Sequence, residues 1–180
     1  MSTHAMRRAL VLITLAGAGA AVLVTAGTTG SAAQPAARDD RGVTAVRNAT
    51  AKFHDVDVAL AAGYVPVSHC EELPGTGAMG IHYLHPDLAA DHRLVPTQPE
   101  VLLYEPTEDG LVLVGVEYFV AEEAVRGSAP SVLGRRLNGP MAGHSPQMPT
   151  HYDLHLWVWR DNPDGLSADW NPAVSCQHES

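Results

Sequence analysis

Apolar residues recur every three or four positions across residues 44–63, a spacing that predicts an amphipathic helix. The residues of this apolar stripe are Val46, Ala49, Phe53, Val56 and Leu60. Thr44 is placed to cap the first turn, and Gly63 lies where a glycine commonly follows a helix end. We therefore expect one long helix at the start of the folded part of the chain.

Four later stretches are interpreted from their residue types. Residues 101–105 and 111–120 are apolar, β-branched or aromatic, and turn-forming residues separate them, which predicts a hairpin. The second strand of this hairpin is apolar on both faces, so we expect it to be central in its sheet. Residues 79–84 and 151–159 predict two further strands, and residues 131–136 predict a short helix.

The order of these elements predicts an α+β fold: an antiparallel β-sheet with one long N-terminal helix and one or two short helices packed on it. Residues 43–180 are enough for a single globular domain and too few for two comfortable ones. Residues 34–42 are short and polar, and we expect them to form a disordered linker.

The N-terminus has the pattern of a secretory signal peptide. Arg7 and Arg8 precede an uncharged apolar run over 9–24, and small residues at 31–33 fit a cleavage site. The alternative is a membrane anchor, but the run is shorter than the roughly twenty apolar residues of a span. We predict that residues 1–33 are cleaved, which leaves a secreted, extracytoplasmic protein without a stable membrane span.

The net charge of the chain limits the classes of partner that it can bind. Its formal net charge is −9, and removal of a signal with two arginines would make the remainder more acidic. Proteins that bind nucleic acids or anionic membrane surfaces need a basic footprint. The predicted partners are therefore a small ligand or a metal ion, and nucleic acid is excluded.

The chain has two cysteines, Cys70 and Cys176. In an exported protein an even number of cysteines predicts a disulfide bond, and here only one pairing is available. In the chain-entropy model, closing a loop of roughly a hundred residues stabilises a fold by about 4–5 kcal/mol. A metal site that uses these cysteines is the alternative.

The last predicted strand carries candidate metal ligands. Alternation places His151, Asp153 and His155 on one face of it. On a strand the two histidines are about 13 Å apart, so a metal ion at about 2 Å from each ligand cannot bind both. The segment therefore contributes both histidines only if it is helical, and otherwise one of them, with Asp153 as a possible neighbour.

Glu117 and His82 are the other candidates. Glu117 is the single charge inside a long apolar run, so it needs a partner such as a metal ion, an arginine or a histidine. His82 also lies between apolar residues. Two histidines and a carboxylate would leave an open coordination position, as in catalytic zinc and non-haem iron sites. Glu105 lies near the hairpin turn, about 20 Å from Glu117, so the two do not form a glycosidase-type carboxylate pair.

These observations give a metal-site hypothesis with His82, Glu117, His151 and His155 as the candidate ligands. Copper, zinc and iron are the candidate metals, and Met79, Met148 and His144 add donors that suit copper. The catalytic residues are unknown, and whether the protein is an enzyme is left open. The alternatives are a non-catalytic extracellular domain that binds a small ligand and a structural envelope protein in which the histidines only pack.

Several of these segments together resemble a family of uncharacterised exported proteins of actinobacteria. The matching stretches cover most of the predicted domain and are residues 53–56, 62–64, 79–83, 99–106, 114–118 and 151–155. The resemblance implies export and a single domain. It implies no activity and no catalytic residues.

Overall fold

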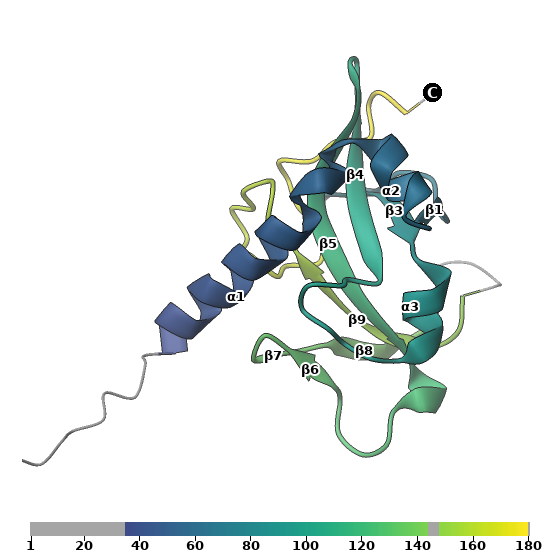
Figure 1. The fold of residues 1–180 in the computed structure, drawn as a ribbon. Helices are drawn as coiled ribbons and strands as arrows, with labels where there is room; N and C mark the ends of the chain where they lie inside the picture. The colour runs from purple at the N-terminus through teal and green to yellow at the C-terminus, as the bar shows by residue number, and fades with distance from the viewer. Residues whose placement is uncertain (1–34, 144–147, 180) are drawn as a thin grey trace, which may run out of the picture. The chain divides into compact units, whose positions relative to one another are not determined.

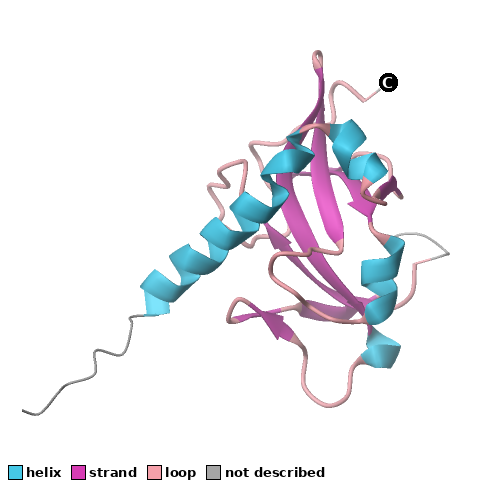
Figure 2. Cartoon of the chain, viewed as in Figure 1, coloured by secondary structure: helices cyan, strands magenta, loops and turns pink. Residues whose placement is uncertain are grey.

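A computed structural model describes residues 35–143 and 148–179, which fold into a mixed α+β structure. Figure 2 shows most of its strands gathered into one twisted sheet with helices beside it, and a small separate hairpin. Seven strands form one sheet, and the paired strands in it are antiparallel. The predicted signal peptide, residues 1–33, lies outside the described residues.

The strands of this sheet are β1 (Val65–Pro66), β2 (Glu71–Leu73), β3 (Gly77–Leu84), β4 (Val101–Thr107), β5 (Gly110–Ala121), β8 (Asn138–Met141) and β9 (His151–Leu156). They lie side by side in the order β1-β3-β4-β5-β9-β8, and β2 pairs with another part of β3. A separate two-stranded sheet consists of β6 (Ser131–Val132) and β7 (Arg135–Arg136). The helical elements are α1 (Pro35–Thr50), η1 (Ala51–His54), α2 (Val56–Ala61), α3 (Pro86–Asp91) and η2 (Glu122–Ala124).

The predicted hairpin and its central strand are confirmed. β4 and β5 pair from Thr107↔Gly110 to Val101↔Glu117, and β5 lies between β4 and β9. From Leu113 to the end of β5 at Ala121, its residues are buried. A strand that is covered on both faces needs apolar side chains on both, which is the pattern of this sequence.

The prediction of a single long helix over residues 44–63 is wrong in its extent. Asp55 has an extended backbone (φ −89°, ψ 108°) and accepts a hydrogen bond from the amide of Asp57, so it starts α2 and separates it from η1. Thr44 lies inside α1, which begins at Pro35, within the segment 34–42 expected to be a linker. Gly63 follows the end of α2 with φ +103°, a conformation that favours glycine.

Two other expectations are corrected. Residues 131–136 form the β6–β7 hairpin in place of a helix, because Leu133 and Gly134 both have positive φ and close a tight turn. The last strand ends at Leu156, because the amide of Trp157 leaves the sheet and donates to the carbonyl of Leu166. Helix α3, which begins at Pro86 shortly after the end of β3, was not predicted at this position.

The two faces of the sheet are filled differently. One face packs its large side chains, among them Leu102, Tyr104 and Tyr118, against the helical segment from α1 to α2, which supplies Val46 and Phe53. Figure 1 shows the C-terminal end of α1 and the η1 turn that follows it passing across one end of β5 and β4. The Tyr104 hydroxyl donates to the Phe53 carbonyl at 2.6 Å.

A smaller apolar cluster lies on the opposite face and includes Val101, Leu103, Phe119 and Trp157. This is also the face that carries the candidate ligands, because His82 pairs with Leu103 and Glu117 pairs with Val101 in the strand register. The site therefore lies on the face of the sheet that has less apolar packing.

The predicted disulfide is present: Cys70 and Cys176 are joined, with 5.5 Å between their Cα atoms and a sequence separation of 106 residues. The bond ties the C-terminal segment to the start of β2. Within the described ranges, no helix is long and apolar enough to cross a membrane.

Candidate metal centre

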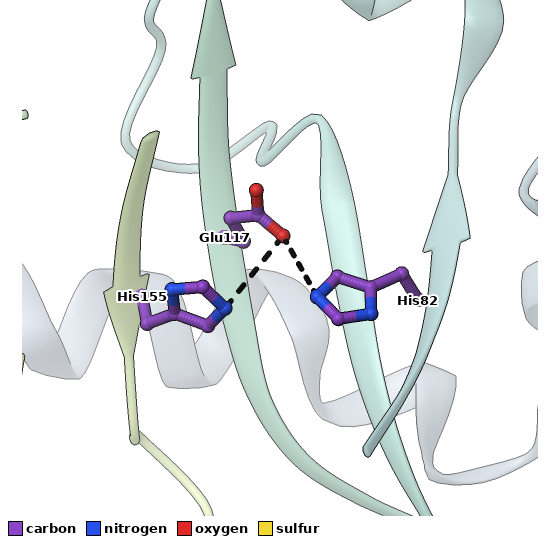
Figure 3. Close-up of side chains that lie close together, drawn as sticks. All are labelled: His82, Glu117 and His155. Atoms are coloured by element: carbon purple, nitrogen blue, oxygen red, sulfur yellow. Dashed lines mark ion pairs between the residues drawn. The ribbon is translucent and has the colours of Figure 1, made fainter. Parts of the chain in front are cut away.

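Three strands bring His82, Glu117 and His155 together (Figure 3). Glu117 on β5 lies directly opposite His155 on β9 in the antiparallel register. On its other side, Glu117 pairs with Val101 of β4. Leu103, two positions further along β4, pairs with His82 of β3. Side chains two positions apart on a strand share a face, so β4 places His82 and Glu117 on the same side of the sheet.

The donor atoms of the three side chains lie close together. The distance from Glu117 Oε2 is 3.4 Å to His82 Nε2 and 3.9 Å to His155 Nε2. The three donor atoms all lie within 4.8 Å of one another. Ligands at about 2 Å from one metal ion are separated by roughly 3–4 Å. Small side-chain rotations therefore bring this group to coordination distance.

The three side chains are largely buried, which is unfavourable for a lone negative charge. The Glu117 and His155 side chains are 2% and 1% exposed, and that of His82 is 12% exposed. Burial raises the pKa of the Glu117 carboxyl well above its ordinary range, and the nearby carboxylates of Asp153 and Glu71 raise it further. A cation beside Glu117 would offset this cost, because an opposite charge favours the ionised carboxylate.

Neighbouring groups orient the two imidazoles. Ser68 Oγ lies 3.1 Å from His82 Nδ1 and also accepts a hydrogen bond from the His82 amide. In the tautomer that carries its proton on Nδ1, the His82 ring donates to Ser68 and its Nε2 lone pair faces Glu117. The His155 ring stacks on Trp157 at 6.1 Å between ring centroids and 19° between planes.

The three side chains open onto a cavity of about 830 Å³. Its apolar wall includes Leu84, Pro86, Ala89, Val101, Phe119 and Ala121. Acidic side chains also line it, among them Glu71, Glu123 and Asp153. A metal ion in the wall of this cavity would be reached by molecules of moderate size.

The fourth candidate ligand, His151, is not part of the group. It lies four residues before His155 on β9, with its Nε2 3.6 Å from Asp153 Oδ2 and its ring 5.0 Å from that of Phe119. Strand geometry predicts this separation, since two histidines four apart on a strand cannot share one ion. His144 lies outside the described residues, and Met148 lines the cavity.

Glu105 has a structural role away from the cluster. It lies in β4, where it forms an ion pair with Arg160 and accepts a hydrogen bond from the amide of Ser175 at 3.0 Å.

Two acidic residues near the site were not among the predicted ligands. Glu71 follows Cys70 in a segment with no clear period, so no pattern identified it. Glu100 lies just before β4, and its Oε2 accepts a hydrogen bond from the Phe119 amide at 3.1 Å, where β5 continues past the start of β4. In the sequence, the signal for this role of Glu100 is its position directly before the buried strand β4.

No protein-family model, curated protein or solved structure matches this chain. The resemblance noted from its motifs therefore stays a prediction, and the function is argued from the geometry of the site.

Proposed function

We propose that the protein binds one divalent transition-metal ion through His82 Nε2, Glu117 Oε2 and His155 Nε2. The observation that carries the proposal is a buried carboxylate held between two imidazoles on three strands of one sheet. The ion pairs of Glu117 with other described residues are to these two histidines. A divalent ion would stabilise the charge that burial disfavours.

The donor set favours zinc, iron(II) or copper(II). Imidazole nitrogen suits all three metals, and a carboxylate oxygen adds a negative charge without a soft thiolate. Both cysteines of the chain are in the disulfide, so they are not available as thiolate ligands. Three protein ligands leave at least one coordination position for water or another molecule.

Metal analysis of the purified protein tests the proposal. Wild type, dialysed against zinc and then against metal-free buffer, is expected to keep one equivalent. Glu117→Gln and His82→Ala are expected to lower zinc affinity by more than about 100-fold, since the loss of outer-sphere partners alone costs about 10- to 100-fold. Binding can be measured by competition with a chromogenic chelator.

His69→Ala is the matched control. His69 also lines the cavity, but its side chain is 99% exposed, so its removal should leave both fold and affinity unchanged. Circular dichroism of each variant separates loss of binding from loss of fold. A wild-type protein without metal after incubation with zinc, copper(II) and anaerobic iron(II) would contradict the proposal.

We also propose that the protein acts outside the cytoplasm. The Cys70–Cys176 disulfide supports this, because such bonds persist mainly in oxidising compartments. If the signal over residues 1–33 is cleaved as predicted, N-terminal sequencing of the exported protein should begin at Gln34. A chain that keeps Met1, or one with two free thiols after denaturation without reductant, would count against export.

A further inference from the structure

We propose that the open position of the metal takes a small uncharged molecule with an apolar body and one nitrogen or oxygen donor. This inference rests on the proposed metal site and adds the chemical class of its ligand. It is carried by the size, the apolar wall and the charge of the cavity that borders His82, Glu117 and His155.

The size of the cavity comes from small side chains. Helix α3 contributes Ala89 and Ala90, and β5 contributes Ala121, two strand positions beyond Phe119. None of these methyl groups can fill the space in front of Glu117, whereas the opposite face of the sheet is packed with leucine, tyrosine and valine. A volume of about 830 Å³ is within the range of small-molecule sites, which cover roughly 300–1,000 Å³.

The wall of the cavity suits an apolar molecular body. Leu84, Val101 and Phe119 lie on the same face as the metal-binding group, and Pro86 and Met148 also line the cavity. Removing apolar surface from water favours binding by about 25 cal/mol per Å², so an aromatic ring in this space adds affinity.

The charges disfavour an anion. Glu71, Glu123 and Asp153 line the cavity in addition to Glu117, and no lysine or arginine of the described chain does so. The two positive charges of a divalent ion are already balanced by the carboxylate of Glu117 and one further carboxylate. A ligand carboxylate would therefore enter a region without net positive charge, whereas a neutral donor meets no such repulsion.

Cobalt(II) binding provides the test, because its visible absorption reports the ligands around the ion. Imidazole, 4-phenylimidazole and 4-phenylimidazole with a para-carboxylate are titrated into the cobalt-loaded wild-type protein. The phenyl compound is expected to bind at least tenfold more tightly than imidazole. The carboxylate derivative is expected to bind at least tenfold more weakly than the phenyl compound.

Ala90→Trp gives a variant with less cavity space, because Ala90 is exposed on α3 and accepts a larger side chain without disturbing the core. It is expected to lose the preference for phenylimidazole while keeping cobalt and imidazole binding. Ala61→Trp, on the exposed surface of α2 and away from the cavity, is the matched control and should behave as wild type.

The two proposals fail in different ways. Cobalt that binds normally, with equal affinities for imidazole and phenylimidazole or a preference for the carboxylate derivative, would overturn the ligand class and leave the metal site standing. A preference that survives Ala90→Trp unchanged would place the phenyl ring elsewhere and also overturn it. Absence of any cobalt spectrum would overturn both.

Discussion

Ser68 holds the His82 ring from the side away from Glu117. Its hydroxyl lies 3.1 Å from His82 Nδ1 and also accepts from the His82 amide, so it restrains both ring and backbone. Ser68→Ala is expected to lower zinc affinity about 10- to 100-fold, the usual cost of losing an outer-sphere partner. Chelator competition measures the loss. Ser68→Thr retains the hydroxyl and should bind closer to wild type, and equal affinities for wild type and Ser68→Ala would contradict the argument.

Glu100 predicts a pH-dependent stability. The pKa of its carboxyl is raised from an ordinary 4.5 to about 8, mainly by burial and to a smaller extent by nearby Asp91, against the opposing effect of the Phe119 amide. The folded state therefore keeps this proton to higher pH than the unfolded chain does. Between pH 4.5 and about 8, unfolding releases the proton of Glu100, so the free energy of unfolding falls as pH rises through that window. Above about pH 8 the full loss of stability is present.

Glu100→Gln isolates this effect, because glutamine stays uncharged and can still accept from the Phe119 amide. The variant is expected to be more stable than wild type at pH 9, by a few kcal/mol at about 1.4 kcal/mol per pKa unit. The difference should vanish near pH 4, where both side chains are neutral. Urea unfolding at the two pH values measures it. An equal difference in stability at both pH values would show that the pKa of Glu100 is not raised in the folded protein.

At the residue scale, the sequence predicted the site in part. His82 and Glu117 stood out because each is a polar side chain among apolar neighbours, which is costly without a partner. Alternation along one strand could not choose between His151 and His155, because both lie on the same face. That choice depends on the pairing of β9 with β5, a long-range register that no local pattern contains.

At the element scale, strand patterns were better predicted than helix ends. The β4–β5 hairpin follows from local turn chemistry, so it was predicted within a few residues. The break at Asp55 interrupts an apolar stripe that continues with helical spacing, so periodicity alone missed it. The β6–β7 hairpin depends on positive φ at Leu133, a conformation that leucine seldom adopts and that its sequence does not signal.

Gly115 keeps β5 and β9 close beside the metal-binding group. A Cβ at this position would lie 3.0 Å from the Leu156 carbonyl oxygen and 3.3 Å from side-chain atoms of Leu103 and Trp157. Gly115→Ala is expected to push the strands apart and to cost about 1–3 kcal/mol of stability, as overpacking does. It should also weaken zinc binding, since Glu117 and His155 face each other across these strands.

Thermal unfolding and chelator competition on the same Gly115→Ala sample measure the two effects. Val112→Ala, in the same strand at a position that is 38% exposed, is the control and should change neither by much. An alanine variant with wild-type stability and affinity would show that the strands adjust without moving the ligands.

At the scale of the whole molecule, two separate restraints act on the fold. The disulfide joins residues 106 positions apart and fastens the C-terminal segment near β2. The metal would join β3, β5 and β9 within the sheet. The first acts mainly by restricting the unfolded chain, and the second by binding only the folded one.

Because they act on different states and different elements, the two contributions are expected to add. Replacing Cys70 and Cys176 with serine should lower the free energy of unfolding by up to about 4–5 kcal/mol. Zinc at about 1,000 times its Kd should raise it by about 4 kcal/mol in both wild type and the serine variant. Chemical unfolding with and without zinc gives all four values. The contributions of coupled sites to the free energy of unfolding do not add. A zinc effect that is much smaller in the serine variant would therefore show that the disulfide positions Ser68, and through it His82.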